Sequence, residues 1–429
     1  MRGRLNAFQA AMLRWRALYP YNAVHIAFVR APCDLSRVAE AVTRQREAFG
    51  LTGLALDARR RRYEYRGGAP ATRVEVIAAA DDGPRAALQR EIERQLNLAF
   101  PADGPLEPMR FFVVAEDDGF HLGLAYDHFI AGGDSIAVLL AAIVRRYRGE
   151  PYTGPPPDLY PPTFRRLLAR RVGAFVRGMP AIRTVIASFR RGVRPRYTDD
   201  ADGYNGFLSI ELTPAQSAAL FANAKRWGVT FNDVVTAAMM IVLARSVPNR
   251  GSQRQRSEVG IASIVNLRRE CGLDTRAAFG QFLASMRVAH PVPVDIGLAA
   301  LAQDVDRETR KIKSTRLYLQ TLLAVRVNGI AWRFLDAPRR QRFYAKAFPV
   351  LGGLTTLNVD ALWSAAGAPS PPDGYMRAVP TGPLAPLVVA ATTATRAVRL
   401  GVTYRRAAFQ PEHAARITAD IAQCLISGD

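Results

Sequence analysis

Cysteine is scarce in this sequence. Only three of the 429 residues are cysteines, and Cys33, Cys271 and Cys424 lie far apart along the chain. A disulfide framework requires cysteines in pairs, and a zinc site requires cysteine or histidine ligands at close spacing. The sequence therefore predicts neither a disulfide-stabilised protein nor a metal centre.

Long apolar runs are missing as well. The longest, VVTAAMMIVLA at 234–244, is well short of the roughly 20 residues that a transmembrane helix needs. Residues 1–16, MRGRLNAFQAAMLRWR, are basic and amphipathic and lack the continuous apolar core of a signal peptide. We expect a cytoplasmic protein, with association to a membrane surface as an open alternative.

Lysine is nearly absent, although the chain is strongly basic. The lysines are Lys225, Lys311, Lys313 and Lys346, so arginine supplies nearly all of the formal net charge of +21. Arginine in place of lysine is also what a GC-rich genome encodes, so this composition says little about function. The charge itself attracts anionic partners, among them nucleic acid, anionic lipid, acidic carrier proteins and CoA phosphates. Because zinc-finger spacing and RNA-binding aromatic patterns are missing, we expect no nucleic-acid partner.

The length of the chain favours about two domains or lobes. Residues 150–163, EPYTGPPPDLYPPT, contain six prolines, which cannot continue a helix or a central strand. We expect an N-terminal lobe at 1–155, a proline-rich and basic segment at 156–200, and a C-terminal lobe at 201–429. Strand-like and helix-like stretches occur in both lobes without a regular βαβ repeat, which predicts a mixed α/β (α+β) class.

Local patterns predict the main elements of both lobes. In the first lobe we expect a strand at 21–32, a helix capped by Asp34, and two strands within 110–128 joined by a turn at 117–119. In the second lobe, the patterns predict strands at 207–213 and 258–269 and an apolar helix at 229–247. They also predict a terminal hairpin at 386–406 and a closing helix at 411–427.

His128 is the candidate for chemistry. It ends a predicted strand and precedes a glycine-bearing loop and a helix, and its ordinary pKa near 6.5 suits proton transfer at neutral pH. We interpret the other four histidines as structural: His25, His121, His290 and His413. The loop also has a purely structural interpretation, in which Asp134 or Ser135 caps a helix starting at Ile136 and the two glycines make the turn.

The stretch DHFIAGGDS at 127–135 resembles the HHxxxDG signature of the condensation-domain superfamily. This superfamily includes condensation domains of nonribosomal peptide synthetases, wax-ester and polyketide-associated acyltransferases, alcohol acetyltransferases and chloramphenicol acetyltransferase. Other stretches resemble the family in the same order along most of the chain, namely PYNAVHIAFVRAPCDLSRVAEAVTRQREAF, VTFNDVVTAAMMIVLAR, IVNLRR, AFGQFLASMRV and LTTLNVDALW.

The resemblance implies a two-lobed chloramphenicol acetyltransferase-like fold, each lobe a mixed sheet with flanking helices, with a tunnel between the lobes. A thioester, on CoA or on the phosphopantetheine of an acyl or peptidyl carrier protein, would enter from one side, and a small-molecule alcohol or amine from the other. His128 would be the general base of a direct acyl transfer without a covalent enzyme intermediate. No cofactor is implied, since the thioester is a substrate. The expected role is in specialised-metabolite or lipid biosynthesis as a free-standing enzyme.

The sequence departs from the family motif at two positions. Asp127 replaces its first histidine and Gly132 its aspartate, while the following glycine is kept as Gly133. In the family the aspartate pairs with an arginine that fixes the loop. The resemblance therefore makes Arg268 or Arg269 the candidate arginine, and Asp134 the candidate to replace the lost carboxylate.

These departures leave an alternative to the enzyme. A catalytically silent condensation-like protein would act as a binding or scaffold module. The resemblance also makes Asn358 a substrate-lining residue, because it matches a family asparagine near the tunnel.

Residues 164–196 predict a basic amphipathic helix. Its apolar side packs on the body of the protein in one interpretation. In the other, the basic helix contacts an anionic membrane surface or an acidic acyl-carrier protein.

Overall fold

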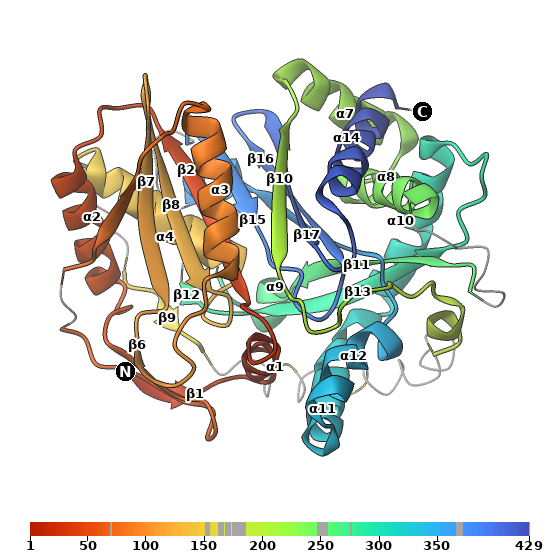
Figure 1. Ribbon diagram of the computed structural model, residues 1–429, viewed down its shortest axis with the longest axis horizontal. Helices are drawn as coiled ribbons and strands as arrows, with labels where there is room; N and C mark the ends of the chain where they lie inside the picture. The colour runs from red at the N-terminus through yellow and green to blue at the C-terminus, as the bar shows by residue number, and fades with distance from the viewer. Residues whose placement is uncertain are drawn as a thin grey trace.

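Two β-sheets lie side by side, each with helices against it (Figure 1). The computed structural model describes residues 1–68, 71–150, 155–161, 167, 173, 186–246, 256–274, 277–365 and 372–428. The basic amphipathic helix expected at 164–196 lies largely outside the described residues.

The first sheet has the strand order β15-β2-β8-β7-β5. Its strands are β2 (Asn22–Val29), β5 (Val74–Ile77), β7 (Met109–Glu116), β8 (Gly119–Asp127) and β15 (Gly374–Ala378). β7 and β8 form the expected hairpin, with Glu116 opposite Gly119 across a tight turn. β5 pairs in parallel with β7 and the other pairs are antiparallel, so the sheet is mixed.

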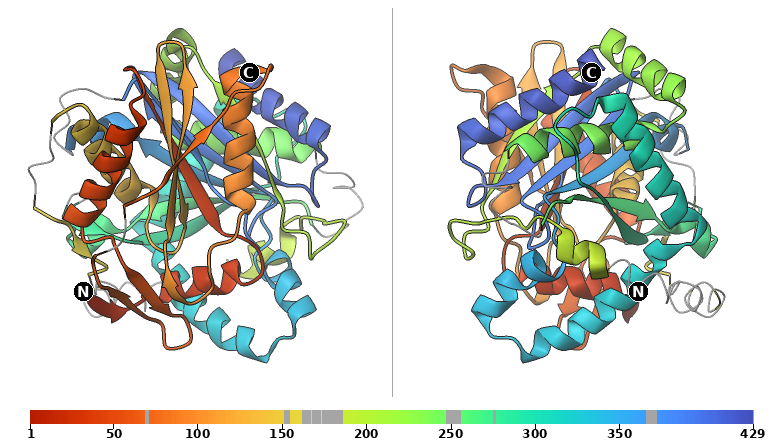
Figure 2. Two further views of the ribbon diagram at one scale, coloured as in Figure 1. Left: turned by 60° about the vertical axis from the view of Figure 1, so that its left-hand side comes forward. Right: turned by 90° about the vertical axis from the view of Figure 1, so that its right-hand side faces the viewer.

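Helices cover this sheet, and a small second sheet adjoins it (Figures 1 and 2). The helices are α2 (Leu35–Ala48), α3 (Gly83–Asn97) and α4 (Gly133–Tyr147). Asp34 caps α2 as expected, because its side chain accepts a hydrogen bond from the Arg37 N–H at 3.1 Å. The small sheet consists of β1 (Arg2–Arg4), β4 (Arg62–Tyr65), β3 (Leu54–Asp57) and β6 (Gly104–Leu106), and α1 (Ala7–Arg16) follows β1.

The second large sheet has the order β10-β17-β16-β14-β11-β13. Its strands are β10 (Asn205–Glu211), β11 (Val259–Asn266), β13 (Leu283–His290), β14 (Gly352–Asn358), β16 (Leu387–Ala394) and β17 (Ala397–Arg405). The helices beside it are α7 (Pro214–Trp227), α8 (Phe231–Ser246), α10 (Leu298–Ser314) and α14 (Pro411–Ser427). β16 and β17 form the predicted hairpin, and α8 is the predicted apolar helix, buried along most of its length.

Shorter elements join the two halves. They are β9 (Asp158–Leu159), α9 (Arg268–Cys271), β12 (Ala278–Phe279), η2 (Leu317–Leu319), α11 (Gln320–Ala331), η3 (Trp332–Phe334), α12 (Ala337–Ala347) and α13 (Val359–Ala365). β9 pairs with β12, and α11 packs on α1, so segments distant in sequence meet where the lobes join. Helices α11 and α12 project at the lower edge of the molecule in Figure 1.

The mixed α/β class and the two lobes predicted from the sequence are confirmed. One strand departs from the expected division of the chain, because β15 lies in the C-terminal half and pairs with β2 of the first sheet. β2 is apolar and almost wholly buried, so as an edge strand it would leave its backbone groups unpaired. Trp363 and Tyr375 of the C-terminal half accordingly pack into the core of the first lobe.

Within the described residues, no single helix has the length and apolar composition to cross a bilayer. α7 and α8 meet these criteria only as a pair, and the pair bends by 99° at the break between them.

Candidate active site

His128 lies directly after β8, where the two lobes meet. Its backbone N–H donates to the Tyr21 carbonyl at 3.0 Å, and its side chain is buried, with 8% of the residue exposed. The rings of Tyr21 and Tyr126 lie against the imidazole, with centroids 5.5 and 5.6 Å away. The imidazole is therefore held between aromatic rings in a largely dry environment.

Burial sets the protonation state of this imidazole. Loss of hydration lowers the pKa of His128 to about 4. A hydrogen bond with the Ala131 backbone acts in the opposite direction, and the charge of Arg377 lowers the pKa further. The ring is consequently neutral at pH 7 and has a free lone pair to accept a proton.

Gln281 holds the motif loop from the side of the second lobe. Its Nε2 donates to the carbonyl oxygen of His128 and, at 2.5 Å, to that of Ala131, and it lies 3.5 Å from Nδ1 of His128. The neighbouring Gly280 carbonyl accepts from the Gly132 N–H at 3.0 Å. The segment between β12 and β13 therefore fixes the backbone on both sides of the loop.

Helix α4 begins earlier than the capping pattern predicts. It starts at Gly133 with Gly132 as N-cap, and no side chain caps it. The prediction that Asp134 or Ser135 caps a helix starting at Ile136 is therefore wrong. Both residues lie within the first turn of α4, and their side chains bond to Arg268 of the second lobe instead of capping the helix.

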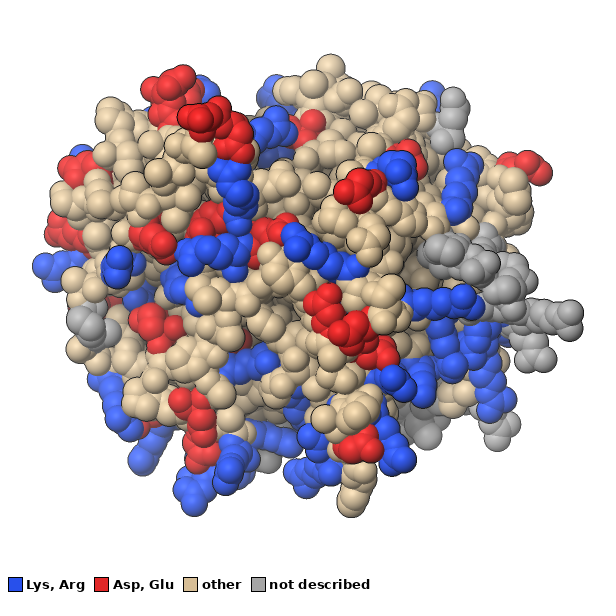
Figure 3. Space-filling view, in the orientation of Figure 1, with Lys and Arg blue, Asp and Glu red and all other residues tan. Residues whose placement is uncertain are grey.

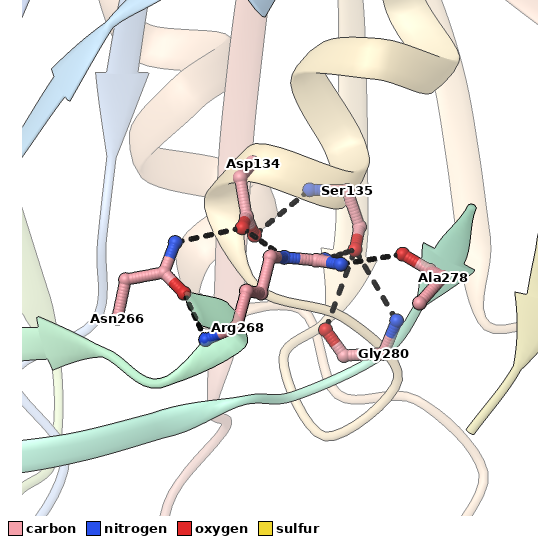
Figure 4. A network of polar contacts seen from close by, with 6 residues as sticks. All are labelled: Asp134, Ser135, Asn266, Arg268, Ala278 and Gly280. Atoms are coloured by element: carbon pink, nitrogen blue, oxygen red, sulfur yellow. Dashed lines mark hydrogen bonds and ion pairs between the residues drawn. The ribbon is translucent and has the colours of Figure 1, made fainter. Parts of the chain in front are cut away.

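An ion pair joins Asp134 to Arg268 across the lobes (Figure 4). Oδ2 of Asp134 accepts from Nε of Arg268 and from Nδ2 of Asn266, the latter at 3.0 Å. The side chains of Asp134 and Arg268 are 8% and 4% exposed, so the pair is shielded from water. Of the two candidate arginines, Arg268 makes this contact, whereas Arg269 is exposed. Both follow β11 in α9, not in a strand as the sequence predicts.

The rest of the Arg268 guanidinium is also bonded. Nη1 donates to the Ala278 carbonyl and Nη2 to Oγ of Ser135, each at 2.6 Å, and that Oγ accepts from the Gly280 N–H at 3.2 Å (Figure 4). A Cβ atom at Gly132 would lie 3.0 Å from Oδ1 of Asp134. The Asp134 carboxylate thus occupies space next to position 132, where the family motif has its aspartate.

Asp127 is held by α1. Its buried carboxylate pairs with Arg16, whose guanidinium also donates to the Pro101 carbonyl at 2.9 Å and lies 5.3 Å from the centre of the Phe129 ring. Gln9 of α1 donates to the Phe129 carbonyl at 3.2 Å. Asp127 therefore fixes α1 beside the motif loop.

Asn358 lies at the end of β14 and is exposed. Its Oδ1 accepts from the Ala361 N–H at 3.1 Å, so the side chain caps α13. A substrate-lining role stays a prediction, since no contact joins Asn358 to the motif loop within the part of the chain that the structure describes.

A second buried polar cluster lies behind the loop. Nδ1 of His25 is 2.7 Å from the Tyr375 hydroxyl, and its Nε2 is 3.5 Å from the Tyr126 hydroxyl. Burial keeps the pKa of His25 well below its usual range. A Cβ at Gly133 would lie 3.6 Å from Nε2 of His25, so this glycine brings the start of α4 close to the cluster. The bonded, fully buried ring supports the structural interpretation of His25.

Arg377 ties the two sheets together next to this cluster. It lies on β15 of the first sheet, and it donates to Thr392 Oγ1 at 3.0 Å and to the carbonyls of Thr355 and Ala391 at 3.1 and 3.0 Å in the second. Its Nη1 lies 3.2 Å from the position of a Cβ at Gly133. Burial lowers the pKa of Arg377 to about 10, so it stays charged at pH 7.

Sequence reasoning missed Gln281 and Arg377. Gln281 lies within AFGQFLASMRV, a stretch that already resembles the family, and a polar residue flanked by apolar ones is the signal that it offered. No local pattern in the sequence marks Arg377, because its guanidinium donates hydrogen bonds to other strands, β14 and β16.

Two cavities lie among the described residues away from the motif loop, and His128 lines neither of them. One of about 750 Å³ adjoins the small sheet and β7, and one of about 420 Å³ lies between α3, β8 and β10. The tunnel expected at His128 therefore stays a prediction. Among the described residues, no group of three histidine, cysteine or acidic side chains is placed to hold a metal ion.

Residues 205–339 match the family described as phthiocerol/phthiodiolone dimycocerosyl transferase C-terminus. No curated protein sequence matches the chain.

The solved structures that are similar over nearly the full length of the chain include the following three. The first condensation domain of the calcium-dependent antibiotic synthetase, in complex with a substrate analogue, has a TM-score of 0.70 at 17% identity, covering 100% of this chain and 96% of that chain. The condensation domain of the Monacolin K polyketide synthase MokA has a TM-score of 0.66 at 15% identity, covering 100% and 97%. Polyketide synthase associated protein 5 from Mycobacterium tuberculosis has a TM-score of 0.61 at 14% identity, covering 99% and 97%.

At these identities the solved structures show a shared fold, and the family match adds similarity in sequence. Together they support the predicted resemblance to condensation-domain-like acyltransferases, and the motif at 127–135 stays a prediction. The chain thus has the fold of condensation domains over nearly its full length, and residues 205–339 match the dimycocerosyl transferase C-terminus family.

Proposed function

We propose that this protein transfers an acyl group from a CoA or carrier-protein thioester to an alcohol or amine, with His128 as general base. The observation that carries the proposal is the state of this side chain, which is neutral, buried and fixed where the lobes meet. Nε2 of Gln281 lies 3.5 Å from Nδ1 of His128. In the proposed mechanism Nε2 of His128 takes the proton of the acceptor.

The chemistry balances without a covalent intermediate on the enzyme. Nε2 of His128 takes the proton of the acceptor hydroxyl or amine while the acceptor attacks the thioester carbonyl carbon. The tetrahedral intermediate then expels the thiolate, which receives that proton from the imidazolium. Because burial disfavours the charged ring, the imidazolium returns its proton readily. General-base assistance of this kind contributes about 10²–10⁴-fold in rate, and holding both substrates together contributes further.

The strongly basic surface suits the proposed donors. CoA phosphates and acidic acyl or peptidyl carrier proteins are both attracted by a net charge of +21. The matched family is named for a dimycocerosyl transferase, and the similar solved structures include condensation domains of an antibiotic synthetase and a polyketide synthase and a polyketide synthase associated protein. These relatives support the proposed role in specialised-metabolite or lipid biosynthesis.

The Asp134–Arg268 pair supports an active enzyme over a silent one. It bonds the first turn of α4 to the second lobe although position 132 carries no carboxylate. A catalytically silent binding or scaffold protein is the second candidate, and the position of both cavities away from His128 favours it.

Thiol release tests the proposal. Acyl-CoA and acyl-carrier-protein donors are incubated with pooled alcohols and amines, and the native protein is compared with His128→Ala. His121→Ala is the matched control, since His121 lies on the same β8 strand, beside Glu116 and away from the loop. We expect acceptor-dependent release that falls by about 10²-fold or more in His128→Ala and persists in His121→Ala.

Equal release from the native protein and a folded His128→Ala variant would contradict a general-base role. Tight binding of a carrier protein without turnover by any donor would favour the silent binder.

A further inference from the structure

Helix α11 and the turn η3 that follows it expose three large apolar side chains. Val327, Ile330 and Phe334 are 63%, 60% and 81% exposed. Their spacing of three and four residues places them on one side of the helix. The two elements lie at the lower edge of the molecule, as Figure 1 shows.

The opposite side of α11–η3 is apolar too. Leu322, Val325 and Trp332 are buried against the body of the protein, and Gly329 lies against Arg14 of α1. A surface helix of a globular protein ordinarily has one apolar side, which faces the core, whereas α11–η3 has apolar residues on two opposite sides. The outward side is therefore left uncovered by the fold, and such a patch marks an interaction surface.

Cationic side chains surround the patch. Arg326 and Arg333 are exposed on the same segment, and neither forms an ion pair within the described part of the chain. Arg333 and Arg61 lie close enough to Arg14 for their charges to lower its pKa, after the larger effect of burial. Arg14 is thus repelled by Arg61 and Arg333, and an anionic partner beside Arg333 would offset this repulsion.

The excess of positive charge extends along the neighbouring helix. Residues 320–347 contain six arginines and lysines and one acidic residue, Asp336. Figure 3 shows lysine and arginine side chains gathered along the lower edge of the molecule, where α11 and α12 project in the same view. The surface is therefore apolar at its centre and cationic around it.

We propose that this α11–η3 face, formed by Val327, Ile330 and Phe334 with Arg326 and Arg333, docks on an anionic lipid membrane surface. The apolar side chains would enter the interfacial layer while the arginines contact lipid phosphates. A membrane is favoured over a protein because the side chains project from a protruding helix, and a deformable layer covers such a convex shape.

The proposed docking face is connected to the active site through one helix. Gly329 of α11 packs on Arg14 of α1, and α1 contacts the motif loop through Arg16 and Gln9. A docked molecule would hold His128 one helix away from the lipid layer. The docking itself does not depend on the proposed acyl transfer, so binding and activity are tested separately.

Vesicle co-sedimentation of the full chain tests the proposal. Vesicles of phosphatidylcholine alone are compared with vesicles that also contain phosphatidylglycerol, at low and high salt. We expect binding to the anionic vesicles that weakens with salt. Replacing Arg326 and Arg333 by glutamine should weaken it about fivefold per arginine. Replacing Val327, Ile330 and Phe334 by serine should weaken it more than about tenfold.

Val294→Ser is the matched control, because Val294 is 86% exposed on a different segment. It should bind like the native protein. A Phe334→Trp variant adds a second readout, since its fluorescence should shift to shorter wavelength with anionic vesicles alone.

Two results would overturn the proposal. The first is anionic-vesicle binding that is absent, or unchanged in folded variants of the α11–η3 face. The second is that the native protein binds an acidic carrier protein but not vesicles, and that the variants of the α11–η3 face lose this binding. That result would assign the face to a protein partner.

Discussion

Replacing Arg268 by methionine leaves the Asp134 carboxylate buried without its cation. Asp134 keeps two donors, the Asn266 amide at 3.0 Å and the Ser135 N–H at 2.9 Å. The change also removes the hydrogen bonds that Arg268 donates to the Ala278 carbonyl and to the Ser135 hydroxyl. The perturbation is therefore centred on the contact between the motif loop and the second lobe.

The magnitude follows from the burial of the pair. Breaking a buried ion pair by removing one partner costs about 3–5 kcal/mol, because an uncompensated charge remains. The two donors that stay with Asp134 favour the lower end, about 3 kcal/mol, for the charge alone. Since 1.4 kcal/mol corresponds to about a tenfold change in an equilibrium, local opening of the loop should become about 10²-fold more frequent.

Hydrogen exchange at the backbone amides of 129–135 measures this opening directly. We expect exchange about 10²-fold faster in Arg268→Met than in the native protein. Arg269→Met is the matched control, since Arg269 is the adjacent arginine and is exposed. Unchanged exchange in Arg268→Met, or an equal effect in Arg269→Met, would refute the reasoning.

A rescue variant tests whether Asp134 replaces the missing motif aspartate. Gly132 has φ −80° and ψ 163°, a conformation that aspartate adopts without strain. Asp134→Ala should speed exchange of the loop, and adding Gly132→Asp should slow it again, because the Cβ atom of the new side chain would lie 3.0 Å from the position of Oδ1 of Asp134. In the native background, Gly132→Asp should instead destabilise the loop by placing two carboxylates together.

Three further predictions concern the surroundings of His128. Because folding lowers the pKa of His128 to about 4, its contribution to stability is complete above about pH 6.5 and is lost as the pH falls toward 4. Between pH 7 and pH 5 the unfolding free energy of the native protein should therefore fall by about 2 kcal/mol more than that of His128→Gln, as measured by urea unfolding. Equal losses in both proteins would contradict this. Gln281→Ala removes two hydrogen bonds to the loop and should lower acceptor-dependent thiol release about tenfold. Unchanged release would show that the loop keeps its conformation without Gln281. Arg377→Met should raise the pKa of His128 in an NMR titration and Arg377→Lys should not, because lysine keeps the charge; identical titrations in both variants would contradict an electrostatic effect.

Elements with local signals were predicted well from the sequence. The patterns correctly predict the strand containing His25, the helix capped by Asp34 and the β7–β8 hairpin, and they also predict the order strand, loop and helix around His128. Each of these patterns depends on residues within a few positions of one another, so no information from distant parts of the chain is needed.

Features set by distant partners were not predictable in this way. The start of α4 was misplaced because the Asp134 side chain, which suits a cap, is bonded to Arg268 134 positions away. The pairing of β15 with β2 and the bonds of Arg377 likewise join segments whose proximity no local pattern indicates. Long-range bonds of this kind determine the candidate site more than any motif letter does.

The same reasoning explains why a motif can lose a residue and keep a contact. Gly132 and Asp134 lie on either side of the first helical residue of α4, so a side chain at position 132 would start next to the Asp134 carboxylate that pairs with Arg268. The buried guanidinium of Arg268 needs an anion beside it, because leaving it unpaired would cost stability. The carboxylate that pairs with it need not stand at one fixed position of the sequence. A sequence comparison by position would score Gly132 as a loss. The structure shows the carboxylate of Asp134, two residues further along, bonded to Arg268 of the opposite lobe.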